Sequence, residues 1–93
     1  MKIRKNPELI LRRIAGETVL IPTGSFAAAF NGIIHLNGPA AFIWEQMERA
    51  KSREELAQSL FDRYEIDEET ARKDVNGFLD TAAYVGYAVD EEA

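Results

Sequence analysis

Hydrophobic and polar side chains alternate along the first third of the chain with a period of about two, which is typical of β-strands. The pattern predicts one strand over residues 9–14 and a β-branched strand over residues 18–21, which stops at Pro22 because proline cannot donate to a sheet ladder. A third strand is predicted over residues 32–36. Residues 25–30 are too apolar for an ordinary loop, and they fit either a short helical turn or a strand extension.

Further along the chain the hydrophobic period changes to about 3.6 residues, which predicts helices. Asn37, Ser52 and Asp67 are suited to cap the starts of three helices. Glu55 completes a capping box with Ser52, and Gly86 is suited to end the third helix. The hydrophobic stripes are Ala40, Ile43, Trp44 and Met47; Leu56, Leu60, Phe61 and Tyr64; and Ala71, Val75, Phe78, Leu79, Ala82 and Val85. Three antiparallel strands followed by three helices predict a small α+β domain with the helices on one sheet face.

Composition narrows the classes of function. The 93 residues fit a single domain over residues 1–93, and no apolar run approaches the roughly 18 residues of a membrane span. The chain has no cysteine and a single histidine, His35, which excludes a disulfide scaffold, thiol catalysis and a multi-histidine metal site. The formal charge of −5 argues against nucleic acid as a partner. We therefore expect a cytoplasmic binding module without catalytic residues, metal or cofactor.

The most specific part of the sequence is residues 30–45. Here a predicted strand ends in Leu36-Asn37, and the pair Ala40-Ala41 and the triplet Ile43-Trp44-Glu45 follow. Further pieces in order along the chain are Val19-Leu20-Ile21-Pro22, Glu54-Glu55-Leu56, Tyr64-Glu65-Ile66-Asp67, Asp74-Val75 and Phe78-Leu79. This ordered set resembles the PqqD family over nearly the whole chain.

The resemblance implies a fold similar to a winged helix-turn-helix and a function in peptide binding. Members of the family are also called RiPP recognition elements, where RiPP means a ribosomally made, post-translationally modified peptide. They bind the leader part of a precursor peptide and present it to a modifying enzyme, often a radical S-adenosylmethionine (SAM) enzyme. Pyrroloquinoline quinone biosynthesis is one natural-product pathway that uses the family. The implied partners are a precursor peptide and a modifying enzyme.

The resemblance also implies that the peptide adds as a strand to the edge of the third strand, beside the third helix. The implied strand residues are Gly32, Ile33, Ile34, His35 and Leu36. Because side chains alternate along a strand, Ile34 shares a face with Leu36, and Ile33 and His35 share the opposite face.

On the third helix, a projection at 100° per residue gives the apolar stripe two borders. One border carries Arg72, Asn76, Leu79 and Ala83, and the other carries Asp74, Gly77, Thr81 and Tyr84. The first border is the predicted peptide-binding one, because Leu79 and Ala83 can receive an apolar anchor and Arg72 can meet an acidic leader.

Two other functions compete with peptide binding. A DNA-binding winged helix needs basic residues on its recognition helix, but residues 67–85 carry five acids against two bases. A structural or homo-oligomeric module is the other alternative. The remaining basic residues gather at the start of the chain and fit an acidic partner protein or peptide better than a duplex: Lys2, Arg4, Lys5, Arg12 and Arg13.

Three expectations concern aromatic and apolar residues. Trp44 lies on the stripe of the first helix, so we expect a structural role. Phe42 lies on the opposite side of that helix, where we expect the apolar residues 25–30 to fold against it. Residues 87–89 are interpreted as a short apolar tail.

Overall fold

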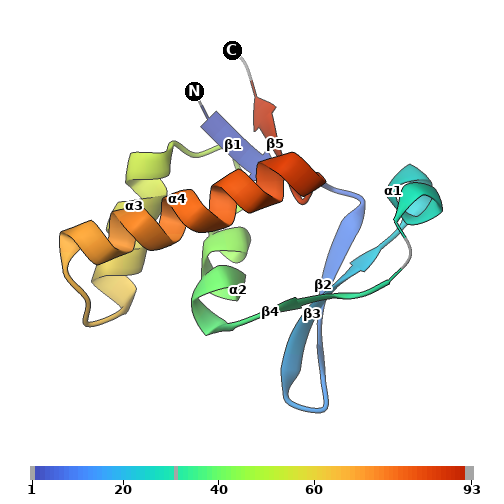
Figure 1. Ribbon diagram of the computed structural model, residues 1–93, viewed down its shortest axis with the longest axis horizontal. Helices are drawn as coiled ribbons and strands as arrows, with labels where there is room; N and C mark the ends of the chain where they lie inside the picture. The colour runs from blue at the N-terminus through green and yellow to red at the C-terminus, as the bar shows by residue number, and fades with distance from the viewer. Residues whose placement is uncertain (1, 31, 92–93) are drawn as a thin grey trace.

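The three predicted strands form one antiparallel sheet (Figure 1). The computed structural model describes residues 2–30 and 32–91 of the chain. In it, β2 (Leu9–Ile14), β3 (Glu17–Pro22) and β4 (Ile34–Leu36) pair in the order β2-β3-β4. β2 and β4 are therefore the two edges of this sheet.

The three predicted helices follow the sheet. They are α2 (Gly38–Glu45), which continues into the 3₁₀ turn η1 (Gln46–Glu48), α3 (Arg53–Arg63) and α4 (Glu68–Val85). α4 packs along α3 and also contacts α2 (Figure 1). With the β2–β3 hairpin as the wing, this α+β arrangement is similar to a winged helix-turn-helix, as predicted. Of the helices in the described part of the chain, none is long and apolar enough to cross a membrane.

The predicted helix caps are confirmed. Asn37, Ser52 and Asp67 each accept a hydrogen bond from the backbone N–H three residues further on, at 2.8, 3.1 and 2.7 Å. Glu55 completes the capping box by accepting from the backbone N–H of Ser52 at 2.9 Å. Gly86 ends α4 in the left-handed conformation, with φ 107°, which glycine adopts without a steric penalty.

The apolar segment before β4 forms a short helix, α1 (Gly24–Ala29), and not a strand extension. A glutamate from before β2 holds its first turn: the carboxylate of Glu8 accepts from the N–H of Phe26 at 2.9 Å and from the hydroxyl of Ser25 at 2.9 Å. Phe26 lies against Gly86, where an added Cβ would be 3.0 Å from the ring. α1 is therefore fixed to both the sheet and the end of α4.

A second sheet joins the two ends of the chain, and the sequence pattern did not predict it. β1 (Lys2–Lys5) pairs antiparallel with β5 (Ala88–Glu91), so residues 87–89 are not a free tail (Figure 1). Ile3 is only 2% exposed and also exchanges two main-chain hydrogen bonds with Lys51, each 2.8 Å long. Only one of the four side chains of β1 is buried, so the sequence of β1 alone gives little sign of a strand. Its extended conformation depends on pairing with β5 at the other end of the chain.

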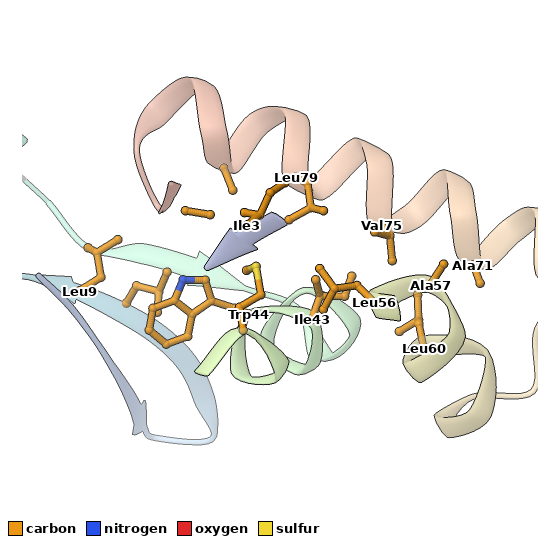
Figure 2. Close-up of a cluster of buried hydrophobic side chains, with 14 of the residues drawn as sticks. Ile3, Leu9, Ile43, Trp44, Leu56, Ala57, Leu60, Ala71, Val75 and Leu79 are labelled. Atoms are coloured by element: carbon orange, nitrogen blue, oxygen red, sulfur yellow. The ribbon is translucent and has the colours of Figure 1, made fainter. Parts of the chain in front are cut away.

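The hydrophobic core lies between the helices and both sheets, as Figure 2 shows. Trp44 is 3% exposed, in agreement with the structural role expected for it. Other core residues come from every layer: Ile3, Leu9, Leu20, Ile34, Ile43, Met47, Leu56, Leu60, Val75 and Leu79.

The expected packing of residues 25–30 against Phe42 is wrong. Phe42 instead meets the ring of Tyr64 edge to face, with the ring centroids 5.9 Å apart. Phe26 lies beside Gly86 at the far end of α4. The Glu8 carboxylate accepts hydrogen bonds from Ser25 and Phe26 and so holds the segment in this position. Helical periodicity cannot indicate such a contact between residues far apart in the sequence.

Candidate functional site

The β2–β3 hairpin determines which main-chain groups of the sheet point outward. Its two loop residues, Ala15 and Gly16, have φ values of 52° and 83°, as a type I′ turn requires. The residues flanking such a two-residue loop, Ile14 and Glu17, form a hydrogen-bonded pair, and these pairs alternate along an antiparallel ladder. The direction of each main-chain group follows from this starting pair.

By this alternation Val19 in β3 directs its N–H and C=O toward β2. His35 lies opposite Val19 in the β3–β4 register, so His35 does not bond to β3. Its N–H and C=O therefore point to the open side of β4, whereas those of Ile34 and Leu36 point to β3. The side chains alternate as predicted: Ile34 is buried, and His35 and Ile33 are exposed.

The opposite edge of the sheet, β2, is covered by charged side chains. The main chain of Leu11 points to the open side of β2, and Arg12 donates to the Leu11 carbonyl at 3.1 Å. Arg13 lies 3.9 Å from Glu45 of α2. Because charged side chains on an edge oppose the pairing of a further strand, β4 is the more receptive edge.

A hollow, here called the α2–α4 hollow, lies between the start of α2 and the side of α4. Asn37 follows β4 directly, so a strand lying along β4 reaches this hollow. Ile43 is almost fully buried and Phe78 is half-buried, whereas Asp74 is exposed. The complete lining is Asn37, Pro39, Ala40, Ile43, Asp74 and Phe78.

The predicted α4 residues are not brought together beside β4. Leu79 is fully buried in the core. Asn76 accepts a hydrogen bond from Arg53 of α3 at 2.9 Å, and Arg72 lines a separate hollow against α3. Ala83 is exposed. Arg72 and Asn76 thus lie on the side of α4 that faces α3.

The border of α4 that lines the α2–α4 hollow carries Asp74 and Phe78. The helical projection assigned Asp74 to the second border and Phe78 to the core stripe. Periodicity identifies the two borders, but the way in which α4 packs on α3 decides which border stays accessible beside β4. No local signal in the sequence makes that choice.

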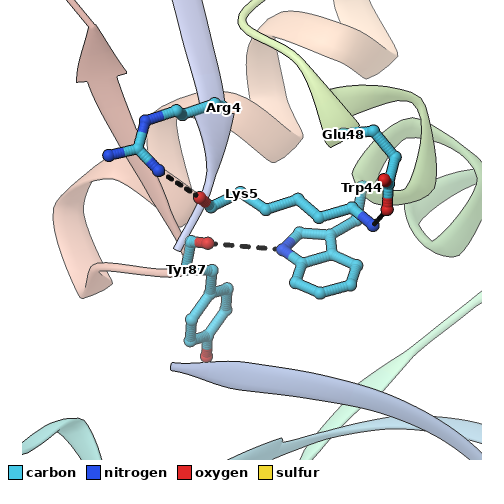
Figure 3. A network of polar contacts seen from close by, with 5 residues as sticks. All are labelled: Arg4, Lys5, Trp44, Glu48 and Tyr87. Atoms are coloured by element: carbon cyan, nitrogen blue, oxygen red, sulfur yellow. Dashed lines mark hydrogen bonds and ion pairs between the residues drawn. The ribbon is translucent and has the colours of Figure 1, made fainter. Parts of the chain in front are cut away.

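Lys5, near the start of the chain, and the core residue Trp44 belong to one polar network within the fold. Lys5 forms an ion pair with Glu48 at 2.9 Å and lies 4.5 Å from the centroid of the Trp44 ring (Figure 3). The hydrogen bond from Lys5 lowers the pKa of Glu48. The indole N–H of Trp44 donates to the carbonyl of Tyr87 at 3.3 Å. This network joins β1, α2, η1 and Tyr87, the residue before β5.

The α2–α4 hollow is lined mainly by apolar side chains. Its side chains offer apolar area, one amide from Asn37 and one carboxylate from Asp74. In the described part of the chain, no three His, Cys, Asp or Glu side chains gather closely enough to hold a metal ion.

Comparisons with known proteins identify the family and the fold. The family model for coenzyme PQQ synthesis protein D (PqqD) matches residues 10–87. The structure of TbiB1 in complex with the TbiA(beta) leader peptide is similar, with a TM-score of 0.73 and 20% identity over 97% of this chain and 99% of that one. Lasso peptide synthetase B1 complexed with the leader peptide has a TM-score of 0.74 and 23% identity over 97% and 100%. The comparison with curated proteins gave no significant match.

Proposed function

The chain belongs to the PqqD family, and on that premise we propose that it is a non-catalytic adaptor that binds the leader segment of a ribosomally made precursor peptide. The adaptor presents this peptide to a modifying enzyme, in particular a radical SAM enzyme, in the cytoplasm. Two solved structures with the same fold are complexes with leader peptides, which supports the proposal.

The observation that carries the proposal is the open edge of β4 beside an apolar hollow. An extended peptide can pair with the outward N–H and C=O of His35 and place an alternate side chain in the α2–α4 hollow. We propose residues 32–36 as the strand surface. On α4 we propose Asp74 and Phe78 in place of Arg72, Asn76, Leu79 and Ala83.

The energetics require both parts of this site. β4 has only three residues, so few outward main-chain groups are available, and each bond contributes about 1 kcal/mol net. Ordering the peptide costs about 2–5 kcal/mol. A buried apolar side chain adds about 1.5–3 kcal/mol, so an anchor in the hollow is needed for useful affinity.

The charge on α4 supports a peptide as ligand over DNA. Acidic residues outnumber basic ones on this helix, and the exposed Asp74 lines the hollow. Binding to DNA depends strongly on Lys and Arg side chains that neutralise its phosphates, and this surface offers a carboxylate instead.

Replacing His35 by proline tests strand addition. His35→Pro removes an outward N–H without removing a bond to β3, so we expect the fold to persist and peptide binding to weaken about two- to tenfold. His35→Ala keeps the N–H and serves as the matched control, with nearly unchanged affinity. Calorimetric titration with leader segments of short open reading frames beside the gene measures the affinity, and circular dichroism checks the fold.

Equal affinity of the folded His35→Pro and His35→Ala proteins for a leader peptide would contradict strand addition at β4. The absence of binding to every neighbouring leader would contradict the adaptor function itself.

A further inference from the structure

We propose that Asp74 selects leader peptides that carry a basic residue two positions from their apolar anchor. This inference rests on the proposed function, because it concerns the side chains of a peptide strand bound along β4. It assigns a chemical class to that peptide.

Asp74 is the single ionisable residue among those that line the α2–α4 hollow. It is exposed, and among the residues that the structure describes no cation lies within ion-pair distance of it. Of the two cations on α4, Arg72 lines the hollow that faces α3. The carboxylate is therefore available to a ligand.

The spacing of the peptide residues follows from two repeat distances. Asp74 and Phe78 are four residues apart on α4, which separates them by about 6 Å along the helix axis. Side chains on one face of a strand are two residues apart, or about 6.6 Å. β4 and α4 run in roughly opposite directions in Figure 1, so a strand added to β4 runs along α4. An anchor beside Phe78 then places the residue two positions away beside Asp74.

A preference for basic leader peptides is the reverse of the sequence-based expectation, in which Arg72 would meet an acidic leader. The reversal follows from the packing of α4, which turns Arg72 toward α3 and leaves Asp74 among the residues that line the α2–α4 hollow. In β4 itself, His35 is paired with the carboxylate of Glu17 of β3 at 3.1 Å. The carboxylates beside the proposed strand position therefore favour a cationic ligand.

Selection from a display library of random short peptides tests the inference without a known leader. Peptides enriched on the unmodified protein are aligned on their apolar anchor, and we expect Lys and Arg to exceed Asp and Glu two positions away by about three- to tenfold. Asp74→Lys should reverse this preference. Asp62→Lys makes the same change of net charge at an exposed position of α3 that does not line the α2–α4 hollow, and it should leave the preference intact.

The possible results separate the two proposals. Enriched peptides with an apolar anchor but no charge preference at this position would overturn the role of Asp74 and leave the adaptor function standing. The role of Asp74 would also be overturned if Asp62→Lys reversed the preference as strongly as Asp74→Lys. Failure of all three proteins to enrich any peptide, with folding verified by circular dichroism, would overturn the proposed function and this inference with it.

Discussion

Trp44 connects three parts of the molecule through one side chain. Its ring is 3% exposed in the core, its indole N–H donates to Tyr87 at 3.3 Å, and the ammonium of Lys5 lies over the ring (Figure 3). Removing it therefore leaves a large cavity, an unpaired carbonyl and an uncovered cation together.

We expect Trp44→Ala to lower the free energy of unfolding by about 3–5 kcal/mol, as large-to-small core substitutions do. Tyr84→Ala is the matched control, because Tyr84 is 92% exposed and its loss should change stability by less than about 0.5 kcal/mol. Denaturant unfolding followed by circular dichroism measures both. A cooperatively folded Trp44→Ala protein with the stability of the parent would contradict the core role.

Single residues were predictable where their neighbours in sequence determine them. The caps at Asn37, Ser52 and Asp67 depend on a backbone N–H three residues away, and all three form. The assignment of Leu79 and Asn76 to a binding surface depends on how α4 packs against α3. Leu79 is fully buried and Asn76 bonds to α3, and a helical projection contains neither fact.

Among the elements, α1 depends most on a single distant group. It has six residues, no acidic residue in its first turn and no side-chain cap from the residue before it. The Glu8 carboxylate supplies the missing acceptor for Ser25 and Phe26. These hydrogen bonds, first that of the Ser25 hydroxyl and then that of the Phe26 N–H, lower the pKa of Glu8.

The lowered pKa gives α1 a dependence on pH. A carboxyl with a depressed folded-state pKa stabilises the fold above its ordinary pKa, about 4.5 for glutamate, and loses this contribution as pH falls through the lower folded value. We therefore expect the amide NMR signals of Ser25 and Phe26 to move toward disordered positions on acidification below about pH 4.5. Glu48, Glu55 and Asp67 also have lowered pKa values, so a local probe is needed.

Glu8→Gln is the control for this titration. The amide side chain has the same shape without the charge, so the two signals should lose their acid transition near the pKa of Glu8. An unchanged transition in Glu8→Gln would mean that another group controls α1.

Helices and strands were predictable from the sequence where their hydrophobic pattern repeats several times. The strands over residues 9–14 and 18–21 and the three long helices have enough repeats to be identified, and they are present. α1 remained open between helix and strand because a distant carboxylate decides it. β1 and β5 have four residues each, and their pairing joins the two ends of the chain, so no local pattern indicates it.

The whole molecule is flat, about 38 × 37 × 18 Å, with its two sheets at different places on the helical layer (Figure 1). The sheet of β1 and β5 closes the core through Ile3, which also bonds to Lys51. The sheet that contains β4 carries the proposed peptide edge. The two ends of the chain thus contribute to stability, and the middle contributes the proposed binding surface.

This separation predicts that stability and binding respond to different substitutions. Ile3→Ala should lower the free energy of unfolding by about 2–5 kcal/mol, because Ile3 is 2% exposed. Ile14→Ala is the matched control on β2, where Ile14 is 52% exposed and a change below about 0.5 kcal/mol is expected. Under conditions where Ile3→Ala remains folded, its affinity for a leader peptide should match that of the parent, because no β1 residue lines the α2–α4 hollow. Denaturant unfolding and calorimetric titration give the two quantities. If the folded Ile3→Ala protein lost as much affinity as His35→Pro, the peptide would have to bind near the chain ends and not along β4.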